Sequence, residues 1–309
     1  AEHAHAVCRG GVGVAGQASR GHRMSSFNIG PAILFVPADR PERYSKAYER
    51  SDAVIIDLED AVAPNDRSSA RTALAEHLAR MDKPTTERTI VRVNPVADPD
   101  FSEDAGLLTN TALRFVMVPK VESIGDISQA ASALPGVKLI ALCESASGVI
   151  EAPQIAKHPS VAALMWGAED LMVSTGGSAS RFADGTYRDV PRFARAQVLL
   201  AAAAAGKASI DTIHTDLSPT DQFIAEAEDA VATGWTAKAC IHPAQVQVIR
   251  DAYTPTEAES EYAHALLAEV KRQRGVFQFR GTMVDGPLIA HAQNVVNRAE
   301  KLKAQLPGE

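Results

Sequence analysis

The sequence predicts an α/β protein, a (β/α)8 TIM barrel followed by a C-terminal helical arm. Short, β-rich runs alternate eight times with helical stretches. Most of these runs are apolar throughout, which is typical of parallel strands covered on both faces. Nearly every run ends in charged or polar residues, and the carboxyl ends of barrel strands share one rim, where active sites lie. An open, doubly wound sheet is the alternative built from the same units.

The predicted strands are, in chain order, Ala32–Ala38, Ala53–Asp60, Thr89–Asn94, Phe115–Lys120, Lys138–Ser145, Ala162–Leu171, Ser209–His214 and Ala237–Pro243. Helical patterns lie between them, among them Asn65–Arg80, Ile124–Leu134 and Arg192–Ala205, the last of which ends at Gly206. A Gly- and Ser-rich segment, Ser174–Asp189, follows the sixth strand and has the composition of an active-site lid.

Domain boundaries follow from these elements. Residues 1–30 are expected to be a disordered leader, because they contain neither a barrel strand nor the apolar centre of a secretory signal. Residues 31–253 are expected to form the TIM-barrel catalytic domain. More residues follow Pro243 than the eighth helix needs, so residues 254–309 are expected to form a C-terminal arm.

Composition narrows the class of protein. With 46% apolar and 22% charged residues, the 309-residue chain is not of the disordered type. A net charge of −7 argues against binding nucleic acid through bulk electrostatics, and no apolar run is long enough to span a bilayer. The scattered Cys8, Cys143 and Cys240 predict free thiols in a reduced, cytoplasmic protein.

Two carboxylates end neighbouring strand-like runs. Glu144 and Asp170 should therefore lie side by side at the rim, where one or two carboxylates together with water and substrate oxygens suit Mg²⁺. The alternative is that they cap helices or pair with arginines. Lys120 suggests a Schiff base, but a lysine beside Glu122 and other carboxylates should stay protonated.

Cations are expected at two places on the rim. Arg92 and Asn94 alternate in one strand and should point to the same side, where a guanidinium suits a carboxylate or an enolate oxygen. The alternative for Arg92 is an ion pair with Asp57 or Glu59. After the first strand, Arg40, Arg43 and Lys46 could contact phosphates or form a solvated helix face.

Eight motifs carry a resemblance to a known family. In chain order they are LFVPADRPERYSKA, DLEDAV, RVN, VPKVES, the strand-end Glu144, WGAEDL, CIHPAQV and MVDGPLI. With these motifs, the chain resembles the citrate lyase β-subunit-like enzymes of the HpcH/HpaI aldolase superfamily, which include malyl-CoA and citramalyl-CoA lyases. The resemblance covers about residues 31–300. No P-loop, GxGxxG after a strand, GxSxG or HExxH motif points elsewhere.

The resemblance implies roles for particular residues. Glu144 and Asp170 would hold Mg²⁺, with Glu144 also facing the substrate, and Arg92 would bind the substrate and stabilise developing oxyanion charge. Arg43 and Lys46 fall in a region that contacts CoA. Asp285 matches a catalytic acid that the C-terminal segment often presents to a neighbouring subunit, so the resemblance implies that the C-terminal arm completes an active site, that of its own chain or of a neighbouring subunit. Without the resemblance, Asp285 reads as a turn residue before Gly286 and Pro287.

The implied activity is that of a Mg²⁺-dependent carbon–carbon lyase. It would cleave or form a 3-hydroxyacyl-CoA thioester such as citramalyl-CoA or malyl-CoA, giving acetyl-CoA and a 2-keto acid, with a malate-synthase-type side activity. A free-standing cytoplasmic homo-oligomer, a trimer or hexamer, is expected. The alternatives are a metal-dependent aldolase acting on free 2-keto acids, whose early histidine base is missing from ADRPERY, and a non-catalytic lyase-subunit homologue.

Overall fold

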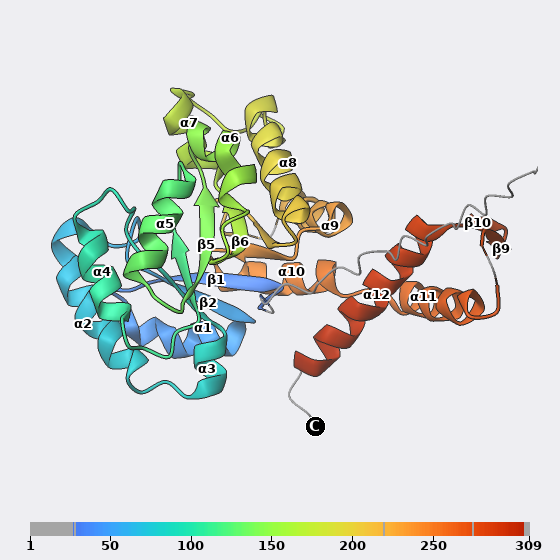
Figure 1. Cartoon of the computed structure of the whole chain (residues 1–309), viewed down its shortest axis with the longest axis horizontal. Helices are drawn as coiled ribbons and strands as arrows, with labels where there is room; N and C mark the ends of the chain where they lie inside the picture. Colours follow the sequence, from blue (N-terminus) through green and yellow to red (C-terminus); the bar gives the residue numbers. More distant parts are fainter. Residues whose placement is uncertain (1–26, 28, 219, 274, 306–309) are drawn as a thin grey trace, which may run out of the picture.

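The computed structural model describes residues 27, 29–218, 220–273 and 275–305. Eight parallel strands close into a barrel in chain order, with helices around the outside (Figure 1). The strands are β1 Ala32–Pro37, β2 Ala53–Asp57, β3 Thr89–Arg92, β4 Phe115–Val118, β5 Lys138–Cys143, β6 Val161–Trp166, β7 Ala208–Asp211 and β8 Ala237–Cys240. The predicted TIM barrel is therefore confirmed, and each strand ends before the last residue of the run predicted for it.

Helices follow the strands as the sequence pattern indicates. They are α1 Tyr44–Arg50, α2 Arg67–Leu78, α3 Lys83–Glu87, α4 Asp100–Leu108, α5 Ile124–Ala133, α6 Ala146–Ile155, α7 Ala168–Thr175, α8 Asp189–Ala204, α9 Asp221–Thr233 and α10 Pro243–Tyr253, with single 3-10 turns η1 Pro41–Arg43 and η2 Pro64–Asp66. Capping fixes several starts; Ser123, for example, accepts the amide of Asp126 at the first turn of α5. The Gly- and Ser-rich segment predicted from residue 174 begins later than expected, because α7 continues to Thr175.

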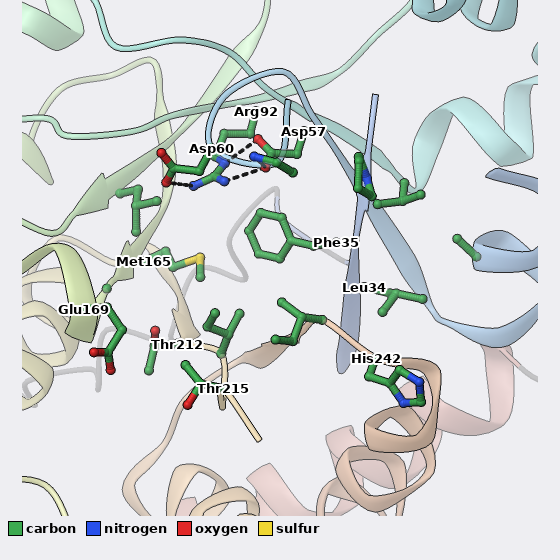
Figure 2. Close-up of a pocket in the computed structure, with 18 of the residues that line it drawn as sticks. Leu34, Phe35, Asp57, Asp60, Arg92, Met165, Glu169, Thr212, Thr215 and His242 are labelled. Atoms are coloured by element: carbon green, nitrogen blue, oxygen red, sulfur yellow. Dashed lines mark hydrogen bonds and ion pairs between the residues drawn. The ribbon is translucent and has the colours of Figure 1, made fainter. Parts of the chain in front are cut away.

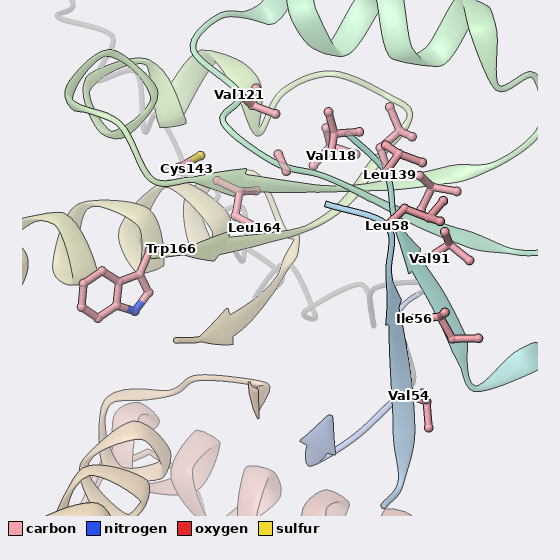
Figure 3. Close-up of a cluster of buried hydrophobic side chains, with 14 of the residues drawn as sticks. Val54, Ile56, Leu58, Val91, Val118, Val121, Leu139, Cys143, Leu164 and Trp166 are labelled. Carbon is pink, nitrogen blue, oxygen red and sulfur yellow. The ribbon is translucent and has the colours of Figure 1, made fainter. Parts of the chain in front are cut away.

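Two apolar layers hold the barrel together. Between strands and helices, side chains such as Val54, Ile56 and Trp166 form the outer core (Figure 3). The alternate strand residues point inward and fill the barrel with the inner core, which includes Ile55 and Met117. This division of each strand between two apolar layers explains why the runs show no polar alternation.

The inner core begins before the first strand. Phe27 and Ile29 are buried in it, and the ring of Phe27 packs edge-on against Phe115 with centroids 5.2 Å apart. The packed part of the chain therefore starts earlier than the boundary at residue 30 that the sequence suggested. Residues 1–26 and 28 of the predicted leader, Cys8 included, lie outside the described residues.

The C-terminal arm has a core of its own. Helix α11 (Glu257–Val270) packs along α12 (Gly286–Gln305), and a hairpin of β9 (Phe277–Phe279) and β10 (Thr282–Val284) joins them. Their buried apolar side chains form a cluster separate from both barrel cores. In Figure 1 the hairpin lies at the far end of the arm, well to one side of the barrel.

The two described cysteines are free and buried, as predicted. Burial raises the pKa of the Cys143 thiol to about 12 and also raises that of Cys240, so neither is a nucleophile at neutral pH. No helix of the described chain has the length and apolar character to cross a membrane.

Candidate active site

A cavity of about 720 Å³ opens at the carboxyl ends of the barrel strands. Its floor is apolar, with Phe35, Leu142 and Met165 rising from the inner core. Arg92 lies with Asp57 and Asp60 at one side (Figure 2). The basic side chains of η1 and α1 form another part of the lining. The rim predicted from the polar strand ends is therefore a real, concave site.

Arg92 is held rigidly in this wall. Its Nε and Nη2 donate to the two carboxylate oxygens of Asp57, each at 2.6 Å (Figure 2). Its Nη1 lies 2.9 Å from Glu59. The ion pair considered as an alternative from the sequence is thus present, and Arg92 lines the cavity as well. Burial opposes the charged guanidinium, but the interactions with Asp57 and Glu59 outweigh it and raise the pKa of Arg92.

Asn94 does not share this position, contrary to the sequence prediction. Strand β3 ends at Arg92, so the two-residue alternation stops there. The Asn94 side chain instead donates to Asp104 of α4 at 2.8 Å and is fully buried. It supports the loop after β3 and does not line the cavity.

Glu144 is a buried carboxylate, with only 3% of its surface exposed. The backbone amide of Lys120 donates to its Oε1 at 3.0 Å. Gly167 leaves room for it, since a Cβ at that position would approach the Glu144 Oε2 to 2.8 Å. Burial, followed by the negative charge of Asp170, raises the pKa of Glu144 to about 8. Its environment does not compensate the negative charge of the ionised carboxylate, and a bound cation would do so. Glu144 therefore fits the role of a cation ligand.

Raising the pH from about 5 to about 9 should destabilise the metal-free protein. The folded-state pKa of Glu144 lies above its ordinary value of 4.5, so protonated Glu144 contributes stability below that value and loses it as the pH rises through about 8. The loss should be on the order of 4 kcal/mol. Urea unfolding in EDTA at several pH values measures it. Glu144→Gln should remove most of this slope, and an equal slope in both proteins would contradict the assignment.

Asp170 faces the same site from a helix. It lies in the first turn of α7, not at the end of β6 as the sequence suggested, and its Oδ1 is 3.5 Å from the Lys120 ammonium. Among the described residues, no three Asp, Glu, His or Cys side chains gather as a complete metal site. A pair of carboxylates suits Mg²⁺, which keeps water or substrate oxygens in its other positions. Glu144 and Asp170 therefore fit that ion.

The predicted basic residues divide into two groups. Arg43 and Lys46 line the cavity, whereas Arg40 is exposed and lies 3.7 Å from Asp39. Arg50 also lines the cavity and was missed. The signal was present, since residues 43, 46 and 50 follow a helical i, i+3, i+7 spacing and share one face.

Two further charged residues of the cavity were not singled out from the sequence. Glu169 accepts a hydrogen bond from the Ser180 hydroxyl at 2.7 Å, and Arg181 forms an ion pair with Glu226 of α9. The two interactions connect the segment after α7, which the sequence predicts to be a lid, to α7 and α9. Because the partners come from separate elements, no spacing in the sequence indicates them.

Asp285 does not line the cavity of its own chain. It lies between β10 and α12, and its Oδ1 is 3.4 Å from the amide of Leu288 in the first turn of α12. Within one chain, Asp285 is therefore the turn residue that its local sequence indicates. A contribution to catalysis requires the cavity of a neighbouring copy.

Comparisons with known proteins agree with this geometry. The model of the HpcH/HpaI aldolase/citrate lyase family matches residues 32–243. A citrate lyase subunit beta-like protein of Mycobacterium tuberculosis is 43% identical over 270 residues, covering 87% of this chain and 96% of the relative. The mitochondrial citramalyl-CoA lyase of Mus musculus is 30% identical over 298 residues, covering 88% and 86%.

A solved structure adds ligands to the comparison. The crystal structure of CitE from Mycobacterium tuberculosis, in complex with magnesium, acetoacetate and coenzyme A, matches with a TM-score of 0.80 and 43% identity, covering 88% of this chain and 98% of that chain. The predictions of the superfamily and of a lyase class are confirmed at family level, and magnesium is present in that relative. The chain belongs to the HpcH/HpaI aldolase/citrate lyase family.

Proposed function

We propose that the chain is a Mg²⁺-dependent carbon–carbon lyase that cleaves a 3-hydroxyacyl-CoA thioester, such as citramalyl-CoA or malyl-CoA, into acetyl-CoA and a 2-keto acid. The observation that carries this proposal is the buried Glu144 beside Asp170 and Arg92 in one cavity. The M. tuberculosis relative that binds magnesium, acetoacetate and coenzyme A supports the choice of ligands.

In this proposal Glu144 and Asp170 hold the ion, and Glu144 also faces the substrate. When bound, Mg²⁺ supplies Lewis-acid stabilisation of negative charge on the substrate oxygens. Arg92 binds the substrate carboxylate or carbonyl. Its guanidinium has five N–H donors, and the two hydrogen bonds to Asp57 leave further donors on both terminal nitrogens. Because Asp57 fixes its plane, Arg92 is preorganised for the oxygen that gains charge.

The bond changes follow from the substrate. The hydroxyl of the substrate loses its proton, the bond between the second and third carbons breaks, and the hydroxyl carbon becomes the ketone of the 2-keto acid. The electron pair of the broken bond forms the thioester enolate, which takes up a proton and becomes acetyl-CoA. Asp285 from a neighbouring copy, in its protonated form, gives that proton and is reprotonated from solvent, which also takes up the hydroxyl proton; in the reverse direction its carboxylate removes a proton from the thioester methyl group.

The remaining parts of the proposal concern the thioester and the assembly. Arg43 and Lys46, joined by Arg50, present positive charge at the cavity for the phosphates of CoA. The arm, residues 254–309, carries Asp285 away from its own barrel and completes the site of a neighbour. This requires a homo-oligomer, and a trimer or hexamer built from head-to-tail contacts satisfies it.

Purified protein should release a 2-keto acid and acetyl-CoA from citramalyl-CoA or malyl-CoA only when Mg²⁺ is present. Mass spectrometry of both products, with and without EDTA, measures this activity. Cleavage of free 4-hydroxy-2-keto acids without turnover of any thioester would instead identify an aldolase. No turnover of either substrate class would indicate a non-catalytic lyase-subunit homologue.

A further inference from the structure

Lys120 contacts the acidic wall of the cavity at several points. Its ammonium lies 2.5 Å from Glu59, 3.4 Å from Asp60 and 3.5 Å from Asp170. Burial opposes its charge, but the hydrogen bond to Glu59 and the three carboxylates outweigh it and raise the pKa of Lys120, so it stays protonated. This agrees with the expectation that it is no Schiff-base lysine, although Glu122 is not among these partners.

The backbone of Lys120 also has an unusual conformation. Its φ angle of 50° lies in the left-handed region, which non-glycine residues seldom adopt. In this conformation its amide donates to Glu144 Oε1 at 3.0 Å while its side chain reaches the acidic residues after β2 and in α7. One residue thus contacts both carboxylates that we assign to the metal, Glu144 and Asp170.

The charge balance explains why a lysine is needed there. Within the described part of the chain, the wall brings together five carboxyl groups and two cations, a surplus of three negative charges when all are ionised. The acidic members are Asp57, Glu59, Asp60, Glu144 and Asp170, and the cations are Arg92 and Lys120. Arg92 is directed at Asp57 and Glu59, so the Lys120 ammonium is the positive charge beside Asp170.

We propose that Lys120 is a positioning residue that acts as a built-in counter-cation, competing with the divalent ion for Asp170 and thereby setting the affinity for that ion. This inference rests on the proposed metal site. The ammonium stays with Glu59, its shortest contact, and withdraws from Asp170 as the ion binds. Its positive charge close to the ion makes binding weaker than the carboxylates alone would allow.

Lys120→Met should bind Mg²⁺ about tenfold more tightly than the wild-type protein, because a like charge is removed from the vicinity of the ion. Isothermal titration of the EDTA-treated, dialysed full-length protein with MgCl₂ measures the affinity without substrate. Lys120→Gln, which keeps a donor for Glu59 without the charge, should bind more tightly as well. Lys120→Arg keeps the charge and should stay close to the wild type.

A second measurement uses the melting temperature. Mg²⁺ should raise Tm more in Lys120→Met than in the wild type, because a tighter ligand stabilises the folded state more at the same concentration. If Lys120 only supported the fold, its replacement would damage the structure and weaken Mg²⁺ binding. Tighter binding is therefore expected only if the positive charge of Lys120 opposes the ion. Unchanged or weaker affinity in folded Met and Gln variants would overturn the inference. If Glu144→Gln binds Mg²⁺ as the wild type does, the proposed metal site itself fails.

Discussion

Replacing Glu144 by Gln or Asp170 by Asn should abolish measurable Mg²⁺ binding and lower kcat/KM for the thioester by about three orders of magnitude, or ~4 kcal/mol of transition-state stabilisation. Each substitution keeps the size of the side chain and removes the negative charge that attracts the ion. The effect should be large because only these two carboxylates are assigned to the metal, so losing one leaves a single protein ligand.

Calorimetry and steady-state assays at several Mg²⁺ concentrations test this expectation. Glu122→Gln is the matched control, since Glu122 follows the neighbouring strand β4 but is exposed and does not line the cavity. It should keep wild-type affinity and turnover. Wild-type Mg²⁺ affinity in either the Glu144 or the Asp170 variant would remove that residue from the metal site.

Replacing Asp285 by Asn should abolish thioester enolisation while leaving Mg²⁺ affinity unchanged. The Asp285 carboxylate is the proposed base that exchanges protons with the acetyl methyl group. Asp285 does not line the cavity of its own chain. Deuterium exchange from solvent into acetyl-CoA, followed by NMR, measures enolisation directly. Glu261→Gln, an exposed change in α11, is the control within the arm and should exchange at the wild-type rate.

Mixing two inactive variants tests whether the base comes from a neighbour. When Glu144→Gln and Asp285→Asn chains are co-assembled in equal amounts, random pairing places an intact barrel opposite an intact arm in about one quarter of the sites. About one quarter of the wild-type activity should then return. Undiminished exchange in Asp285→Asn would exclude this residue as the base. Mixed oligomers without activity would argue against a base supplied in trans.

The barrel could be predicted because its signals are local. Each strand is buried on both faces, so an apolar run marks it without knowledge of its partners. Strand ends were less predictable: Asp170 belongs to a helix and Asn94 turns to α4. A polar residue at the end of an apolar run indicates a position near the rim. The direction in which its side chain points depends on where the hydrogen bonds of the strand end.

The residues of the candidate site were found by their type and by resemblance, not by geometry. Glu144, Asp170 and Arg92 all line the cavity, as their positions at or just after the carboxyl ends of β5, β6 and β3 predict. The helical spacing of Arg43 and Lys46 extends to Arg50, a local signal that could have been used. By contrast, Arg181 pairs with Glu226, a residue distant in the chain, and no local pattern indicates that contact.

The sequence by itself determined the barrel, the rim and the types of side chain gathered there, because buried strands and their polar carboxyl ends produce patterns among residues that are close in the chain. Only the tertiary structure decided their electrostatics. The high pKa of Glu144, the fixing of Arg92 by Asp57 and the reach of Lys120 all depend on atoms brought close from different strands. Solvation and Coulomb interactions depend on distance through space, and separation along the chain does not specify that distance.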